Sequence, residues 1–326
     1  MPPKLVQILS QHVERLVTEL PQPIPITAQP QRWSRDHPAQ AALIYGLSYM
    51  ATGLAGNALV ARTASDIAWW LIIAAVGVLT LVFALLLTLS VCRIVLRPRA
   101  EAVWMVGAGM AFVAARPLVL QAVGKWLAFG GTGVQAASGL SPGRQMVGNI
   151  ALILWAIFLG RLVSRVIKEG KLLLPVAVVA SIADVITVFR GVVAKLTEEA
   201  PRVLQTFSAT LPVAPPKAVS VPVLTEVGLG DFLFLALFLA VALRYSMNAA
   251  KTVWAAFAAM LVAPLAFFIW PKTLETGLPG LPFISAGVLA VNWRHLQYSP
   301  AERRALAVSG ALVGALVAVI WLVIRR

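Results

Sequence analysis

Two aspartates in long apolar segments are the residues of this sequence best placed to do chemistry. Asp184 is the one charged residue of 172–189, and Asp231 is the one charged residue of 227–243. A charged side chain is expensive inside a membrane, and those that occur there commonly serve a function. These two carboxylates are therefore the first candidates for a functional site.

The two aspartates are expected at the same depth in the membrane. Their segments are consecutive, so as spanning helices they share the 190–221 loop and run antiparallel. Asp184 lies six residues before Arg190, and Asp231 lies five residues after Glu226. At 1.5 Å per residue, both carboxylates lie roughly 8–9 Å from the same membrane face. If the helices are neighbours, the two side chains can meet.

Two carboxylates in contact at low dielectric cannot both ionise, so they share a proton. One can then act as a base on water while the other acts as an acid toward a carbonyl oxygen. That is the chemistry of aspartic proteolysis. Two other interpretations stay open: each aspartate pairs with a nearby arginine, or the aspartates line a path for protons or ions.

The composition is that of a membrane protein. Hydrophobic residues make up 60% of the 326 residues and charged residues only 12%, whereas a soluble domain is about 25% charged. Lys and Arg number 27 against 13 acidic residues. In a membrane chain this excess is typical of loops that contact anionic lipid. The patterns that read bases are missing, so we expect the lipid bilayer and no nucleic acid as a partner.

A spanning helix needs about 20 mostly apolar residues. The sequence predicts such helices near 40–61, 67–92, 102–122, 146–164, 172–189, 222–243, 252–270, 279–293 and 305–324. Segment 124–142 is too rich in glycine and serine to assign. The predicted fold is an all-α, polytopic transmembrane bundle of about nine helices.

The chain is predicted to have three parts. In residues 1–39, apolar residues recur at helical spacing before a proline-rich stretch, which predicts an amphipathic helix and a linker. Residues 40–166 hold the N-terminal transmembrane helices. Residues 167–326 form the transmembrane region that carries both aspartates, which is the catalytic region if they act as a pair.

Three arginines within or beside the predicted spans have simple interpretations. Arg116 precedes Pro117, so we expect a kink at this point and a side chain that extends to the membrane surface. Arg161 and Arg165 are four residues apart on one helix face. We expect both to contact lipid phosphate.

Asp231 ends the motif Gly228-Leu229-Gly230-Asp231, which is followed by Phe232-Leu233-Phe234. This motif strongly resembles the signature of the GxGD intramembrane aspartyl proteases, the family of presenilin and signal peptide peptidase, in a prokaryotic-type member. Two more elements follow the family's order. Asp184 stands one helix earlier, in Ala183-Asp184-Val185, and Pro279-Gly280-Leu281-Pro282 resembles the family's Pro-Ala-Leu-Pro motif. The resemblance covers roughly 172–293.

The sequence departs from the family in several places. Ala183 replaces the tyrosine of the family's first motif, and Gly280 replaces the alanine of its last. A further apolar span at 305–324 follows the Pro-Leu-Pro helix. Four predicted spans precede Asp184 where the family has five, and the count agrees only if 124–142 also crosses the membrane.

The resemblance implies a presenilin-like bundle and an aspartic endopeptidase that cleaves transmembrane peptides or proteins. Asp184 and Asp231 would be catalytic, and the active-site support would come from Gly228, Leu229, Gly230, Pro279, Gly280, Leu281 and Pro282. It implies no cofactor and no metal, and the three histidines lack metal-ligand spacing. We expect a multi-pass integral membrane protein of a prokaryotic plasma or inner membrane; the sequence leaves its oligomeric state open.

Two other functions remain possible from the sequence. A proton- or ion-coupled transporter would use the same aspartates as a relay, although no internal repeat is evident. A non-catalytic relative would hold or bind transmembrane helices, and Ala183 is the feature that favours it.

The segment before the second aspartate is predicted to be irregular. Residues 210–223 contain four prolines, so the segment cannot be helical throughout. Val219-Ser220-Val221 could form a short strand that pairs with an unwound substrate, and an ordinary loop is the alternative.

Overall fold

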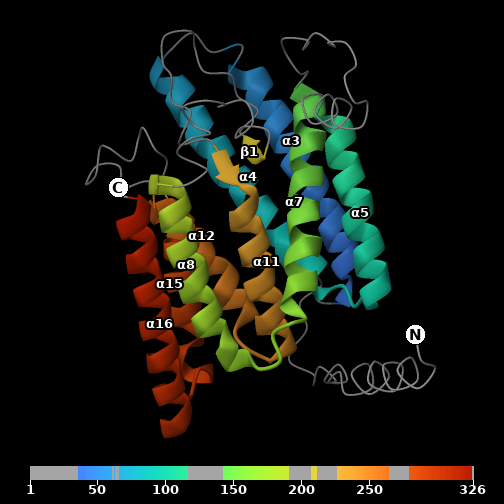
Figure 1. Cartoon of the computed structure of the whole chain (residues 1–326). Coiled ribbons are helices and arrows are strands. Elements are labelled where there is room, and N and C mark those ends of the chain that lie inside the picture. The colour runs from blue at the N-terminus through green and yellow to red at the C-terminus, as the bar shows by residue number, and fades with distance from the viewer. Residues whose placement is uncertain are drawn as a thin grey trace, which may run out of the picture. The chain divides into compact units, whose positions relative to one another are not determined.

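The computed structural model describes residues 36–60, 62, 66–116, 142–190, 207–210, 226–263 and 279–324 (Figure 1). Most of the predicted N-terminal part, nearly all of segment 124–142 and the predicted strand at 219–221 lie outside these ranges. Within them the chain is mostly helical.

Nine α-helices occur in the described ranges, one within or overlapping each predicted span. They are α3 (Pro38–Val60), α4 (Asp66–Arg93), α5 (Pro98–Ala115), α7 (Pro142–Ser164), α8 (Leu173–Arg190), α11 (Leu229–Arg244), α12 (Ala249–Val262), α15 (Leu281–Asn292) and α16 (Pro300–Ile324). Short 3-10 turns, η1 (Gly170–Leu172) and η4 (Trp293–His295), precede α8 and follow α15. By length and composition, four described stretches are long and apolar enough to cross a membrane: Pro38–Val60, Ala68–Arg93, Gly143–Ser164 and Gly170–Val188.

Two predicted helix boundaries are wrong, each for a local reason. The predicted 102–122 helix ends at Ala115, because Arg116 precedes a proline and adopts an extended conformation, with φ −110° and ψ 98°. The predicted 222–243 helix begins only at Leu229, because Glu226–Gly228 forms a strand. The fold is therefore not purely α-helical.

The strands form one small antiparallel ribbon in the described residues. Strand β1 (Ser208–Thr210) pairs with β2 (Glu226–Gly228), so that Ser208 lies opposite Gly228. Strand β2 leads without a break into α11. The ribbon thus stands directly at the entrance to the helix that carries Asp231.

Helix α11 is the central helix of the bundle (Figure 1). Its side chains contribute to two buried apolar clusters, one with α3, α4, α5 and α7 and the other with α4, α8, α12 and α15. A helix that is apolar on all sides belongs in such an interior. Helix α7 approaches it closely at Gly160, where a side chain would overlap the carbonyl oxygen of Leu233. The helix that carries Asp231 is therefore tightly packed against its neighbours.

Arg161 and Arg165 both bind a buried carboxylate, which the sequence did not indicate; Arg161 is buried, so its predicted contact with lipid phosphate is wrong, whereas Arg165 stays partly exposed. Glu101, in the first turn of α5, is 2% exposed. Its Oε1 accepts a bond from Arg161 Nη2 at 2.5 Å, and its Oε2 accepts one from Arg165 Nε at 2.6 Å. Arg161 also donates to the carbonyl of Ile94, at 2.7 Å, just after the end of α4. The cluster joins the ends of α4, α5 and α7.

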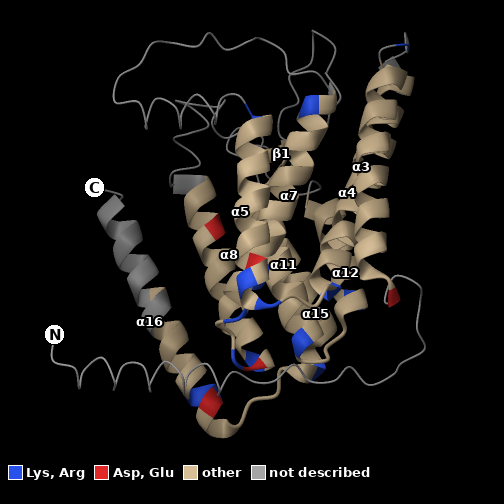
Figure 2. Cartoon of the chain, turned by 90° about the vertical axis from the view of Figure 1, so that its right-hand side faces the viewer, with Lys and Arg blue, Asp and Glu red and all other residues tan. Residues whose placement is uncertain are grey.

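Charged residues gather mainly at the helix ends, and the middle of the bundle is largely uncharged (Figure 2). At the start of α16, Glu302 pairs with Lys171 of η1. The hydrogen bond from this ammonium group lowers the pKa of Glu302 to about 2. The ion pair ties the first turn of α16 to the start of α8.

Candidate active site

Asp184 caps the start of helix α15. It is half-buried in the second half of α8, and its Oδ2 accepts a hydrogen bond from the backbone N–H of Leu281 at 3.0 Å. Leu281 is the first residue of α15, and the first N–H groups of a helix have no acceptor within the helix. The positive end of the helix dipole also favours a negative charge at this position. Asp184 is therefore held in place by a neighbouring helix.

Asp231 lies against the residue just before Leu281. It is half-buried in the first turn of α11. A Cβ added to Gly280 would lie 2.8 Å from Asp231 Oδ1 and 3.2 Å from its Cγ. Gly228 lies on another side of the same carboxylate, since a Cβ there would be 3.6 Å from Asp231 Oδ2. The absence of a side chain at Gly280 is what gives the carboxylate its position.

The structure thus brings the two aspartates to consecutive residues at one helix start. Helices α8 and α11 run antiparallel (Figure 1), and their carboxylates interact electrostatically beside Gly280 and Leu281. Among the described residues, no ion pair involves either aspartate. The alternative that each one pairs with an arginine is therefore not seen in this part of the chain.

The two glycines of the Gly-Leu-Gly-Asp motif have different surroundings. Gly228 ends β2 in an extended conformation, and a Cβ there would make an ordinary contact of 3.6 Å with Asp231 Oδ2. Gly230 is exposed, and a Cβ there would meet nothing within 4 Å. Leu229, between them, donates its N–H to the carbonyl of Phe207 at 3.1 Å. Open space therefore lies one residue before Asp231.

The Pro279–Pro282 segment forms an ordinary helix start. Gly280 is the N-cap of α15 and Pro282 lies in its first turn, where a missing N–H costs nothing. Pro279 and Leu281 are buried. What distinguishes this helix start is its contact with both carboxylates.

The β1–β2 ribbon is the part of the site that the sequence analysis missed. The one strand considered from the sequence, at 219–221, lies outside the described residues, and the observed strands flank the 211–225 segment. Pro222 gave no signal against the predicted 222–243 helix, because proline is well tolerated at the first position of a helix. The strand at Glu226–Gly228 depends on its pairing with Ser208–Thr210, which a local pattern does not reveal.

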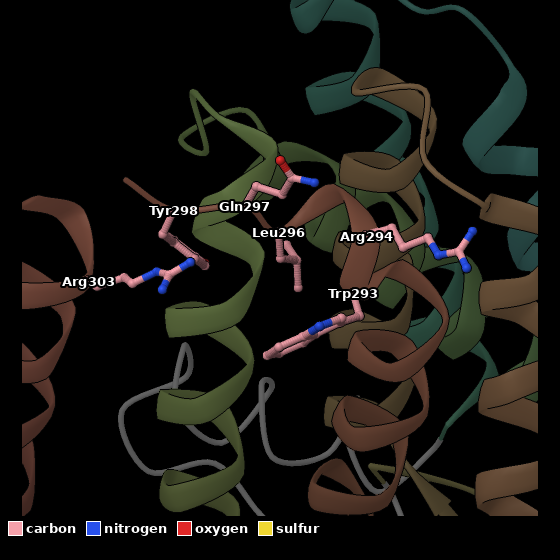
Figure 3. A pocket seen from close by; sticks show the side chains of 6 residues that line it. All are labelled: Trp293, Arg294, Leu296, Gln297, Tyr298 and Arg303. Carbon is pink, nitrogen blue, oxygen red and sulfur yellow. The ribbon is translucent and has the colours of Figure 1, made fainter. Parts of the chain in front are cut away.

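Two hollows in the described part of the surface lie away from the aspartates. One of about 400 Å³ is lined by Trp293, Arg294, Leu296, Gln297, Tyr298 and Arg303 (Figure 3). A second, of about 340 Å³, lies near Lys168 and His295. Both are at the far end of α15, roughly 17 Å along the helix from the carboxylates. Arg294 points away from Tyr298 and Arg303 in Figure 3, so its guanidinium does not converge with that of Arg303.

No family model matches the sequence, no curated protein matches it, and no solved structure matches its fold.

Proposed function

We propose that this chain is an intramembrane aspartyl protease with a presenilin-like bundle. The observation that carries the proposal is that Asp184 and Asp231, from two antiparallel helices, contact consecutive residues at the start of α15, Leu281 and Gly280. The similarity of three ordered motifs to the GxGD family supports it. The chain would be a multi-pass protein of a prokaryotic membrane, and its substrates would be transmembrane peptides or proteins.

The two carboxylates supply both proton transfers that peptide hydrolysis needs. One takes a proton from water as the water oxygen bonds to the carbonyl carbon, and the other gives its proton to the carbonyl oxygen. The tetrahedral diol then breaks its C–N bond as the first carboxyl gives its proton to the amide nitrogen and a diol hydroxyl gives its proton to the second carboxylate. The pair again holds one shared proton, so the two carboxyls and one water account for every proton transferred.

The β1–β2 ribbon gives an extended substrate a place to bind. A peptide bond in a helix is shielded by the helix's own hydrogen bonds, so the substrate must unwind before water reaches it. An unwound peptide satisfies its backbone groups by adding a strand to an exposed edge. Strand β2 ends three residues before Asp231, which places such a peptide beside the carboxylates.

The experiment that tests this function is hydrolysis of a single-span peptide in liposomes made in ¹⁸O-labelled water. We expect new fragments by mass spectrometry, with one ¹⁸O atom in each new carboxyl terminus. Proton flux across the same vesicles is measured in parallel. Flux without fragments would reject the protease and favour the transporter.

Replacement of Gly280 by alanine tests the position of Asp231. It also installs the residue that the resembled family carries here, so the geometry of this chain and the resemblance make opposite predictions. The added methyl group would lie 2.8 Å from Asp231 Oδ1, so the carboxylate has to rotate. A displacement of about 1 Å at a reacting group can cost up to 10²-fold, and we expect peptide cleavage to fall by about tenfold or more. Gly107→Ala, which meets open space on α5, is the matched control. Equal cleavage rates in both variants would contradict the placement of Asp231.

A further inference from the structure

Arg116 is a buried cation that links two helices to strand β1. It is 6% exposed, so the predicted extension to the membrane surface is wrong. Its Nη2 donates to Asn149 Oδ1 on α7 at 2.6 Å and to the carbonyl of Ser208 on β1 at 3.3 Å. A buried guanidinium is tolerated only where acceptors surround it, and here one acceptor belongs to the ribbon beside the aspartates.

The carbonyl that Arg116 binds lies on the outer edge of β1. Leu229 N–H donates to Phe207 O at 3.1 Å, which makes 207 and 229 a hydrogen-bonded pair. Hydrogen-bonded and non-hydrogen-bonded pairs alternate along an antiparallel ribbon. Ser208 and Gly228, the next pair, are therefore not bonded to each other, and the Ser208 carbonyl points away from β2 toward Arg116.

The surrounding helices are shaped to hold this guanidinium. A Cβ added to Gly148 of α7 would lie 2.9 Å from Arg116 Nε, so the missing side chain provides the space. Asn149 is fully buried, and its side chain also bonds the hydroxyl of Tyr49 on α3. Three helices thus contribute to one polar site around Arg116.

Strand β1 depends on contacts of this kind. A two-stranded ribbon is only marginally stable alone. Strand β2 is fixed because it continues into α11. Among the described residues, β1 is joined to the bundle by its pairing, by the buried side chain of Ala209, by Arg116 and by the packing of Phe207 on Phe112, at 5.8 Å between ring centres. Of these contacts, only that with Arg116 occupies the outer edge at Ser208.

We propose that Arg116 is a positioning residue that fixes β1 and closes its outer edge at Ser208. An incoming extended peptide then cannot pair at this edge, and the ribbon keeps one position relative to Asp231. The placement of β1 follows from the contacts alone, whereas its consequence for substrate binding rests on the proposed protease function.

Hydrogen–deuterium exchange of the full chain in nanodiscs, without substrate, tests the placement. In Arg116→Gln we expect the amide of Leu229, which pairs with Phe207, to exchange about 10- to 100-fold faster, the range that a charge-assisted hydrogen bond supports. Gly148→Ala, which displaces the guanidinium without removing it, should change exchange in the same direction. Arg144→Gln is the control, because Arg144 links α7 to the Ala114 carbonyl of α5 at 3.2 Å.

Each outcome decides the proposal. Faster exchange in the ribbon of Arg116→Gln and Gly148→Ala, but not in Arg144→Gln, supports it. Unchanged exchange at Leu229 overturns it. Equal acceleration in the ribbon and throughout α5 and α7 also overturns it, because Arg116 would then be an ordinary core residue. Gly148→Ala keeps the test decisive if Arg116→Gln does not fold.

A cleavage assay tests whether Arg116 also affects substrate binding. We expect Arg116→Gln to raise the KM of a transmembrane peptide about tenfold with kcat nearly unchanged, as for a loss of uniform binding. Arg116→Lys, which keeps the charge, should recover part of this loss. A fall in kcat at constant KM would overturn the edge-closing role. If the wild type cleaves nothing, the proposed function fails, while the exchange result still decides where β1 is held.

Discussion

Asp184→Asn and Asp231→Asn are each expected to abolish cleavage of a transmembrane peptide, with a loss of at least about 10³-fold. General acid–base catalysis by one positioned group contributes about 10²–10⁴-fold, and here both groups act on one water and one carbonyl. The double variant should be no slower than either single one, because residues that work as a unit are not additive. Initial rates from fragment mass spectrometry give the comparison.

The same variants should leave the fold and peptide binding nearly intact. Asparagine has the shape of aspartate, and its Oδ1 can still accept the 3.0 Å bond from Leu281 N–H at position 184. We therefore expect an unchanged Kd for the peptide and a large fall in kcat alone. Asp36→Asn, at an exposed aspartate before α3, is the matched control and should retain full activity. Cleavage that survives in either active-site variant would contradict a two-carboxylate mechanism.

Much of this site could be predicted because its key residues break a simple pattern. A lone charge in an apolar run is visible in any sequence, and the fixed rise of a helix converts distance along the chain into depth. Two antiparallel segments therefore placed Asp184 and Asp231 at one level. That α15 begins at this level could not be derived in the same way, because the meeting point depends on how three helices pack.

The errors share a different cause, which is that the partner is distant in sequence. Arg161 and Arg165 bind Glu101, some 60 residues earlier, and Arg116 reaches Ser208, 92 residues later. No periodicity connects such pairs, so a lipid or solvent contact was the natural expectation for each arginine. The β1–β2 ribbon was not predicted for a related reason: a short apolar stretch does not distinguish strand from helix by its pattern.

Glu101→Ala is expected to be the most destabilising single change outside the candidate active site. Glu101 Oε1 accepts bonds from Arg161 Nε at 3.0 Å and Nη2 at 2.5 Å, and its Oε2 accepts the bond from Arg165. The side chain of Arg161 is 7% exposed and that of Glu101 is 3% exposed. Removing one partner of a buried ion pair costs about 3–5 kcal/mol, because the other charge stays buried without compensation.

Glu169→Ala is the control that shows whether the loss of stability in Glu101→Ala comes from the buried ion pair or from the loss of any paired glutamate. Glu169 pairs with Lys171 at 2.9 Å, but its side chain is 56% exposed, so Glu169→Ala should cost about 0–1 kcal/mol. Unfolding by titration with denaturing detergent gives both free energies in one mixed-micelle system. Glu101→Leu combined with Arg161→Met should recover part of the loss, since the pair is then removed as a whole. If Glu101→Ala and Glu169→Ala lose equal stability, the cluster does not hold α4, α5 and α7 together through its buried charge, and the apolar packing of these helices is sufficient.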